Sequence, residues 1–302
     1  MKPEPQLIVN HGFADLGEIR LHYAECGQGD ELVIFLHGFP ECWYSWRRQL
    51  PVLGKRFHCV APDMRGYNLS DKPAEIKSYR IEFLVQDVVG LIRYFGKEHA
   101  VIVSHDWGAA VAWALAQRHP ELVSKLVALQ VPPPAAWRIN FTLRQLRASW
   151  YMFFFQLPRL PEWWASANDF ARVEKMYQET SVRSDAFTAA DIKVYKEALG
   201  QPGALTSSLN YYRANVFKSL FRRGVKTPRE ENGKVHVPTL FIYGEQDVAV
   251  LPETVRDVGR FVAAPYHELR IPESGHWVQN EAVAEVNHAL LQFLGDESLA
   301  AN

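Results

Sequence analysis

The stretch Ser104-His105-Asp106-Trp107-Gly108 decides the fold of this chain. It comes after an apolar run at residues 99–103 and opens an alanine-rich segment, Ala109 to about Ala116, that favours a helix. A strand, a tight turn with small residues two before and two after a central side chain, and a helix together form a nucleophile elbow. Such a turn holds its central side chain exposed above the carboxyl edge of a sheet.

The central residue of this turn is Asp106. A serine at this place attacks an acyl carbon, whereas a carboxylate attacks an electrophilic alkyl carbon and leaves an ester on the protein. The residue type therefore predicts cleavage of an alkyl–oxygen or alkyl–halogen bond rather than acyl transfer.

Length and composition limit the class of protein. A chain of 302 residues can hold one large domain, or a core with a second domain inserted. Hydrophobic residues make up 48% and charged residues 22% of the sequence, which is typical of a soluble globular protein. The net charge of −1 gives no reason to expect a nucleic acid or an anionic membrane as partner. The sequence does not indicate an oligomeric state.

Cysteine usage and the apolar segments suggest a cytoplasmic location. Cys26, Cys42 and Cys59 are an odd set without C-x-x-C spacing, so we expect reduced thiols and neither a disulfide framework nor a metal site. The first five residues precede no apolar core of a secretory signal. The most apolar window, 150–158, is too short to span a bilayer. No motif requires a cofactor.

Alternating apolar strands and helical segments predict the architecture. Residues 7–13 and 19–26 read as two strands joined by a hairpin turn at 15–18. Continuous apolar runs, of the kind buried on both faces of a parallel sheet, recur at 32–36, 59–61, 100–103, 126–129 and 239–243. This alternation predicts an α/β fold with a mostly parallel sheet flanked by helices.

The alternation stops at Pro132-Pro133-Pro134. The segment from there to about Gly224 has helical periodicity, no clear strand and many aromatic side chains. We therefore expect a helical cap domain at 132–224, inserted after the sixth strand of a core domain formed by 1–131 and 225–302. Trp163-Trp164 fits cap packing and a pocket wall equally well. The pairs Arg47-Arg48 and Arg222-Arg223 are interpreted as solvated charges.

Two later segments supply an acid and a base for hydrolysing the ester. Asp247 lies in the loop just past the strand at 239–243, and His276 comes after the next strand on a glycine-containing loop. Nucleophile, acid and base then occur in the order that the elbow predicts. Glu245 is the nearest rival for the acid, but it lies in the turn, where a solvated carboxylate is expected.

The turn His37-Gly38-Phe39-Pro40 comes directly after the first long apolar strand. Its glycine lets the backbone turn, so that the amide of Phe39 points back toward the elbow. Together with the amide of Trp107 it would form an oxyanion hole for water attack on the carboxyl carbon of Asp106. The side chains next to these groups are expected to line the substrate pocket: His37, Pro40, His105 and Trp277.

These motifs, together with Asp63-Met64-Arg65-Gly66-Tyr67, resemble the epoxide hydrolases of the α/β-hydrolase superfamily. The resemblance covers nearly the whole chain and is weakest in the cap. It implies an α/β-hydrolase fold and conversion of a small apolar epoxide to a vicinal diol, with water as the second substrate. The family uses two cap tyrosines to donate hydrogen bonds to the epoxide oxygen. The resemblance places them at Tyr151 and Tyr212, and Tyr211 is adjacent to the second.

Two positions depart from the family pattern without touching the reaction. Ser104 stands where glycine is more common, and it is still small enough for the turn. Asn68 stands where relatives often carry glycine, and asparagine tolerates the same left-handed backbone region.

Other classes share the aspartate nucleophile. Haloalkane dehalogenases resemble this chain at Trp107 but typically need a second halide-binding N–H, often an asparagine at the position of Phe39. Fluoroacetate dehalogenases carry arginines just after the nucleophile, where this chain has Trp107 and Ala110. The candidate tyrosines favour epoxide opening over both. A non-enzymatic binding protein is a remote third interpretation.

Overall fold

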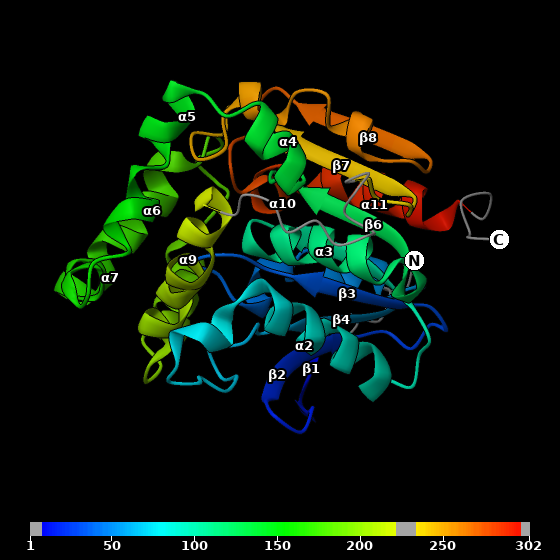
Figure 1. The fold of residues 1–302 in the computed structure, drawn as a ribbon. Helices are drawn as coiled ribbons and strands as arrows, with labels where there is room; N and C mark the ends of the chain where they lie inside the picture. The colour runs from blue at the N-terminus through cyan, green and yellow to red at the C-terminus, as the bar shows by residue number, and fades with distance from the viewer. Residues whose placement is uncertain (1–7, 222–233, 297–302) are drawn as a thin grey trace.

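The computed structural model of this chain describes residues 8–221 and 234–296. Eight strands from these residues form one sheet, with helices on both of its faces (Figure 1). Their order across the sheet is β1-β2-β4-β3-β5-β6-β7-β8. The pairs β1/β2 and β2/β4 are antiparallel and the remaining neighbours are parallel. The strands are β1 (Asn10–Asp15), β2 (Arg20–Cys26), β3 (Leu32–Leu36), β4 (His58–Pro62), β5 (Ala100–His105), β6 (Val123–Leu129), β7 (Thr239–Gly244) and β8 (Tyr266–Ile271).

The central strands are buried on both faces, which explains their unbroken apolar sequence. In β3, Ile34 and Leu36 join one core cluster while Val33 and Phe35 join the other. Successive side chains of a strand point to opposite faces, so a strand between two helical layers must be apolar throughout. The first cluster is covered by α2 (Ile81–Tyr94) and α3 (Trp107–Arg118), and the second by α1 (Leu50–Leu53), α10 (Val278–Glu281) and α11 (Val283–Gly295).

The expected α/β architecture is confirmed, with small shifts at element ends. The hairpin turn lies where the sequence predicts it, with Gly17 in the left-handed region at φ 87°. Its first strand begins at Asn10, later than the expected residue 7, which lies outside the described residues. Helix α3 begins at Trp107, two residues before Ala109, because the elbow itself forms the first helical turn.

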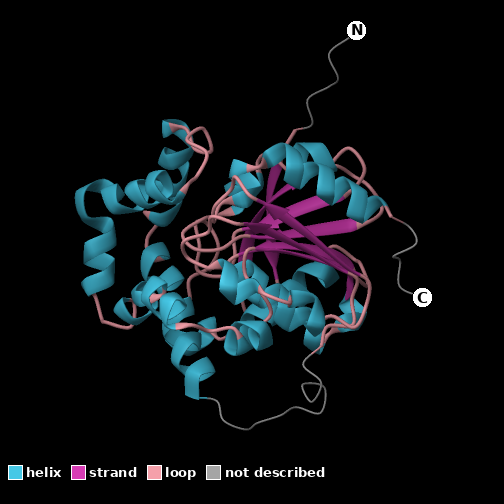
Figure 2. Ribbon diagram, turned by 90° about the horizontal axis from the view of Figure 1, so that it is seen from above, coloured by secondary structure: helices cyan, strands magenta, loops and turns pink. Residues whose placement is uncertain are grey.

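Between β6 and β7 the described chain is helical. The segments are α4 (Pro134–Ile139), α5 (Leu143–Ala148), α6 (Trp150–Phe154), α7 (Leu160–Thr180), α8 (Ala189–Leu199) and α9 (Ala204–Phe221). Helices α5 to α9 form a lobe beside the sheet (Figure 2), whereas α4 lies close to β6 and β7 (Figure 1). Helix α9 lies between the outer helices α6 and α7 and the rest of the molecule (Figure 1). Residues 222–224 of the expected cap lie outside the described residues. Short 3₁₀ helices occur at Trp43–Trp46 (η1), Ile76–Tyr79 (η2), Pro120–Leu122 (η3), Pro252–Val255 (η4) and Val258–Phe261 (η5).

Arg47 joins the helical lobe to the sheet domain. Its guanidinium lies 2.9 Å from the carboxylate of Asp191 in α8 and donates at 2.6 Å to Asn280 in α10. The side chain is 11% exposed, so the interpretation of Arg47-Arg48 as solvated charges is wrong: Arg48 also donates, to the Asn280 carbonyl at 3.3 Å. A buried guanidinium needs such partners because an unpaired buried charge is costly. Arg222-Arg223 lies outside the described residues.

Three further observations concern the cysteines, metal ligation and membrane spans. Cys26, Cys42 and Cys59 are all buried free thiols. Within the described ranges, no group of three or more His, Cys, Asp or Glu side chains could hold a metal ion. None of the helices described is long and apolar enough to cross a membrane.

Candidate active site

Asp106 sits at a strained turn between β5 and α3. Its backbone has φ 50° and ψ −118°, a combination that non-glycine residues rarely adopt. The turn is tight because α3 packs close to the sheet: a Cβ atom at Gly108 would clash with the Leu36 carbonyl oxygen. The Ser104 hydroxyl is buried and donates to the Val127 carbonyl at 2.8 Å. Packing on both sides therefore holds the strained backbone and leaves the Asp106 side chain 15% exposed.

The turn after β3 approaches the Asp106 carboxylate directly. The Phe39 N–H donates to Asp106 Oδ1 at 2.8 Å. A Cβ atom at Gly38 would clash with the same oxygen, so only glycine permits this approach. Trp107 is the first residue of α3, where an amide has no partner within the helix. The two predicted oxyanion donors thus belong to the two backbone segments that flank the carboxylate.

Asp247 and His276 lie in the loops after β7 and β8. His276 Nδ1 is 2.8 Å from Asp247 Oδ2, and His276 Nε2 is 3.8 Å from Asp106 Oδ2. The other Asp247 oxygen accepts the backbone N–H groups of Ala249 at 2.7 Å and Val250 at 2.9 Å, which fixes the carboxylate. The structure therefore brings the three predicted triad residues into one line. The rival, Glu245, has no side-chain hydrogen bond to any described residue.

The neighbouring carboxylates control the protonation of His276. Burial alone lowers the pKa of this imidazole, but the charge and hydrogen bond of Asp247, helped by the charge of Asp106, raise the pKa to about 9. At neutral pH the ring is therefore an imidazolium between two carboxylates. Its Nδ1–H donates to Asp247 and its Nε2–H faces Asp106.

Tyr151 in α6 and Tyr212 in α9 meet above the elbow. Their rings lie edge to face with centroids 5.9 Å apart, and the Tyr212 ring packs against Phe39 at 5.5 Å and Trp107 at 5.1 Å. Burial, then the charge of Asp106, raises the pKa of both phenols. Both hydroxyls therefore stay protonated, and neither donates a hydrogen bond to another residue that the structure describes.

Tyr211, the neighbour of Tyr212, is engaged elsewhere. Its hydroxyl donates to the Arg65 carbonyl at 2.7 Å, and its ring packs against Tyr67 at 5.2 Å and Tyr79 at 5.8 Å. The Tyr211 ring also contacts Trp107, with centroids 5.7 Å apart, but its hydroxyl is taken up by Arg65. The hydroxyl of the pair that is close enough to feel the charge of Asp106 is that of Tyr212.

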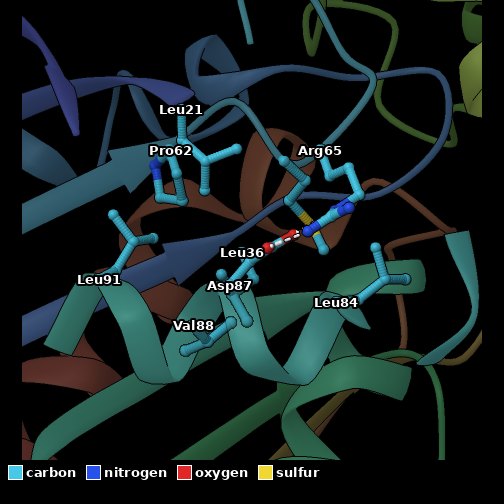
Figure 3. A pocket seen from close by; sticks show the side chains of 9 residues that line it. Leu21, Leu36, Pro62, Arg65, Leu84, Asp87, Val88 and Leu91 are labelled. Atoms are coloured by element: carbon cyan, nitrogen blue, oxygen red, sulfur yellow. Dashed lines mark hydrogen bonds and ion pairs between the residues drawn. The ribbon is translucent and has the colours of Figure 1, made fainter. Parts of the chain in front are cut away.

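A buried ion pair holds Arg65 in place. The Arg65 guanidinium donates to the two oxygens of Asp87 in α2 at 2.7 and 2.6 Å, and both side chains are buried. This ion pair lies at a small apolar pocket next to Leu21, Leu36 and Leu84 (Figure 3). None of the predicted site residues lines it. Asn68 has φ 41°, so the expected left-handed backbone at this position is confirmed.

His37 and Pro40 are buried in the turn that carries Phe39. His37 Nδ1–H donates to the Gly38 carbonyl at 2.9 Å, and Nε2 accepts the Met64 N–H at 3.0 Å. Burial lowers the pKa of this ring, in keeping with the neutral form that these two bonds require. Both ring nitrogens of His37 are thus hydrogen-bonded to the protein backbone.

Glu41 is a site residue that sequence reasoning missed. Its carboxylate lies 2.8 Å from His105 Nδ1, and His105 Nε2 lies 2.8 Å from the carbonyl oxygen of His276. Both partners accept, so His105 donates from both nitrogens and pairs as a cation with Glu41. Burial alone raises the pKa of Glu41, but His105 and the Ser45 hydroxyl lower it overall. A charged residue within an otherwise uncharged turn segment, 36–46, was the available signal.

Three tryptophans, Trp277 of the core domain and Trp163 and Trp164 of the cap, have different surroundings. Trp277 is buried beside His276, and its indole N–H donates to the Thr180 hydroxyl of α7 at 2.8 Å. Trp164 packs on Phe154 within the helical lobe, whereas Trp163 is 66% exposed. The surroundings of Trp164 therefore favour cap packing over a pocket wall.

Comparisons with known proteins fit this arrangement. The family described as alpha/beta hydrolase fold matches residues 31–283. The chain is similar to the AB hydrolase superfamily protein YfhM of Bacillus subtilis, with 39% identity covering 94% of this chain and 98% of the relative. It is also similar to epoxide hydrolase 3 of Mus musculus, with 38% identity covering 92% of this chain and 74% of the relative.

A solved structure gives the same result. The crystal structure of the Bacillus megaterium epoxide hydrolase in complex with an inhibitor superposes with a TM-score of 0.85 at 33% identity, covering 94% of this chain and 100% of that one. Fold, extent and identity all agree with the resemblance seen in the sequence. The chain therefore belongs to the α/β-hydrolase superfamily and, within it, to the epoxide hydrolases.

Proposed function

We propose that this protein hydrolyses a small apolar epoxide to a vicinal diol through an alkyl ester on Asp106. One observation carries the proposal: a carboxylate at a nucleophile elbow lies 3.8 Å from its base, beneath two tyrosines whose hydroxyls donate to no other described residue. A carboxylate nucleophile requires an electrophilic alkyl carbon, and free phenol donors suit a leaving oxygen.

In the first step, Asp106 attacks an epoxide carbon and the carbon–oxygen bond breaks. The departing oxygen takes hydrogen bonds, and then a proton, from Tyr151 or Tyr212. An alkoxide is more basic than a phenolate, and the raised pKa of both phenols keeps them protonated until charge develops on the departing oxygen. Because Asp106 must be ionised to attack, the imidazolium of His276 stabilises its reactive form.

Esterification then changes the neighbour of His276. The Asp106 charge that helped to raise the pKa of His276 disappears, so the imidazolium is less favoured. Its proton passes to the tyrosinate left by the first step, and the neutral ring can then act as a base. His276 takes a proton from water as the water attacks the Asp106 carboxyl carbon. The amides of Phe39 and Trp107 stabilise the resulting oxyanion. Collapse transfers the remaining proton of the attacking water to the departing oxygen, which releases the diol. Asp106 is then again a carboxylate, and His276, with the proton it took from water, is again an imidazolium.

A dehalogenase is the second candidate, and one observation favours it. The indole N–H of Trp107 is buried and interacts only loosely with the Tyr212 hydroxyl, so it could turn to a leaving halide. The side chain of Phe39 offers no second donor, however, and Ala110 carries no charge for a haloacetate. The site thus offers two tyrosine hydroxyls to an epoxide oxygen but a single indole N–H to a halide, which favours an epoxide as the substrate.

The remaining expectations belong to the same proposal. His37 and His105 would support the turn and the base rather than contact substrate, since their nitrogens are engaged with protein groups. The division into a core domain, 1–131 and 225–302, and a cap domain, 132–224, is supported by the run of helices between β6 and β7. A cytoplasmic location is supported by the buried free thiols.

Replacement of the base tests the proposal. His276→Gln should react with styrene oxide and stop at the ester, because no base remains to activate water. Intact-mass spectrometry should then show the protein heavier by one epoxide, with the added mass on the peptide that contains Asp106. The matched control is His267→Gln, an exposed histidine of β8, which should turn over without accumulating ester. An unmodified His276→Gln protein that still forms diol would contradict the proposal.

A further inference from the structure

The outer helices of the lobe expose an unusual amount of apolar surface. Seventeen large apolar side chains are exposed among the described residues, and nine of them fall within 139–163. Scattered exposed apolar residues need no explanation, but a concentration of this kind marks an interaction surface. The nine are Ile139, Phe141, Leu143, Leu146, Trp150, Phe153, Leu157, Leu160 and Trp163.

Six of these residues follow one another at helical spacing across α5, α6 and the start of α7. Leu143, Leu146, Trp150, Phe153, Leu157 and Leu160 are spaced by three and four residues in turn, the spacing of one side of a helix. We call these six the cap stripe.

The opposite side of the same segment faces inward. It carries the buried residues Gln145, Ser149 and Phe155, and Tyr151, whose ring packs on Phe155 and Tyr212. Folding of the chain therefore accounts for the inner face of α5 and α6. The cap stripe, in contrast, is exposed, and neighbouring exposed apolar side chains mark an interaction site.

The charge around the cap stripe has one sign. Residues 132–161 contain four arginines and no aspartate or glutamate. Arg138, Arg144, Arg147 and Arg159 are all exposed, and the single ion pair among them in the described residues joins Arg144 to Glu253 at 3.3 Å, with the Arg144 side chain 78% exposed. The net charge of −1 for the whole chain conceals this local excess of positive charge.

We propose that the cap stripe and its arginines dock on the surface of an anionic lipid bilayer. Leucine, phenylalanine and tryptophan side chains enter the boundary between headgroups and acyl chains, while arginines bind lipid phosphates. A second copy of this chain fits less well, because a symmetric contact would set arginines against arginines. This surface departs from our expectation of no membrane partner, which rested on the net charge of the whole chain.

The cap stripe lies close to the candidate active site, so docking on a bilayer would bring that site near the membrane. Helix α6 lies toward the outside of the lobe (Figure 1), and α5 next to it contacts the loop after β7 through Gln145. Helix α6 carries exposed Trp150 and Phe153 on one side and Tyr151 on the other. An apolar phase that holds apolar substrates would then lie on the far side of the helix that carries Tyr151. The docking itself does not depend on the reaction proposed above.

Vesicle binding tests the proposal. The full chain is sedimented with vesicles of phosphatidylcholine, with or without phosphatidylglycerol, at low and high salt. We expect binding at least about tenfold tighter to the anionic vesicles, and weaker binding as salt screens the charges. Arg144→Glu/Arg147→Glu should weaken anionic binding at least about thirtyfold. Leu143→Ser/Trp150→Ser should weaken binding at both salt concentrations, because the variant loses apolar contacts with the bilayer, which salt does not screen.

Matched variants elsewhere on the molecule separate the stripe from general effects. Arg80→Glu/Arg93→Glu makes the same change in net charge at the two ends of α2. Leu69→Ser/Ile76→Ser removes two exposed apolar side chains from the surface of the core domain. Both should bind vesicles like the unaltered protein.

Three outcomes would overturn the proposal. The first is equal loss of binding in the stripe and control variants, and the second is absence of binding to anionic vesicles at low salt. The third is a dimer in solution that Arg144→Glu/Arg147→Glu or Leu143→Ser/Trp150→Ser converts to a monomer, since the occupant would then be a second copy.

Discussion

Removing the charge of Asp106 should lower the pKa of His276. Asp106→Asn keeps the size of the side chain and removes its charge, as esterification does. His276 Nε2 lies 3.8 Å from Asp106 Oδ2, and the pKa of His276 is raised to about 9 by Asp247 and Asp106 together. The variant therefore isolates the electrostatic change that turns His276 from a cation into a base.

The distance sets the size of the effect. Two unit charges 3.8 Å apart interact by about 4 kcal/mol at an effective dielectric constant of 20, and by about 1 kcal/mol in bulk water. At 1.36 kcal/mol per pKa unit, the loss of Asp106 should bring the pKa of His276 from about 9 to between about 6 and 8. The pKa falls, rather than rises, because a lost anion destabilises the imidazolium.

Nuclear magnetic resonance of histidine-labelled protein measures this pKa. The chain has eleven histidines, and the signal of His276 is the one absent from His276→Gln. Intact mass confirms that the asparagine remains during the titration. Glu245→Gln is the matched control, because Glu245 makes no side-chain hydrogen bond with His276 and its loss should leave the pKa nearly unchanged.

The same shift governs the pH dependence of turnover. Hydrolysis of the alkyl-enzyme needs neutral His276, so its rate should rise with pH through the lowered pKa and then level off. A pKa of His276 that stays near 9 in Asp106→Asn, or rises, would refute the electrostatic switch.

Three further predictions concern the tyrosines, the Glu41 pair and substrate choice. Tyr151→Phe and Tyr212→Phe should each slow alkylation by about tenfold to a thousandfold in rapid-mixing assays and leave ester hydrolysis unchanged. Tyr211→Phe should leave both steps intact. If Tyr211→Phe slows alkylation and Tyr212→Phe does not, the assignment is wrong by one residue. Glu41→Gln should reduce the free energy of unfolding by about 3 kcal/mol in denaturant titrations, because His105 loses its buried counter-charge. A reduction below about 1 kcal/mol would contradict a buried ion pair between Glu41 and His105. Terminal epoxides should be turned over at least about a hundredfold faster than bromo- or chloroalkanes, about 2.7 kcal/mol in activation free energy, and comparable halide release would favour the dehalogenase interpretation.

The sequence predicts most of the fold because its signals are local. An apolar run such as 32–36 has to be a doubly buried strand, and a tight turn with Asp106 at its centre has to be an elbow. The ends of elements were less accurate. Strand β6 begins at Val123, three residues before the apolar run at 126–129, because Ser124 and Lys125 continue the strand despite being polar.

The parts that sequence reasoning missed are long-range polar pairs. Glu41 and His105 are 64 residues apart, and no periodicity links them. Arg47 appeared as a solvated charge because its partner, Asp191, lies in another part of the chain. A buried ion pair is specified by the folded arrangement of its two elements, so neither residue type nor spacing reveals it. The exposed cap stripe was missed for the opposite reason, since helical periodicity alone does not say which face is inside.

The source of the diol oxygen tests the central claim most directly. With enzyme in excess over styrene oxide in heavy-oxygen water, a single turnover should give diol without the heavy isotope, because the first oxygen comes from Asp106. The heavy oxygen should appear in the carboxylate of Asp106, detected in its peptide by mass spectrometry. Heavy oxygen in the diol of the first turnover, with an unlabelled Asp106, would show direct attack by water and contradict the alkyl-enzyme account.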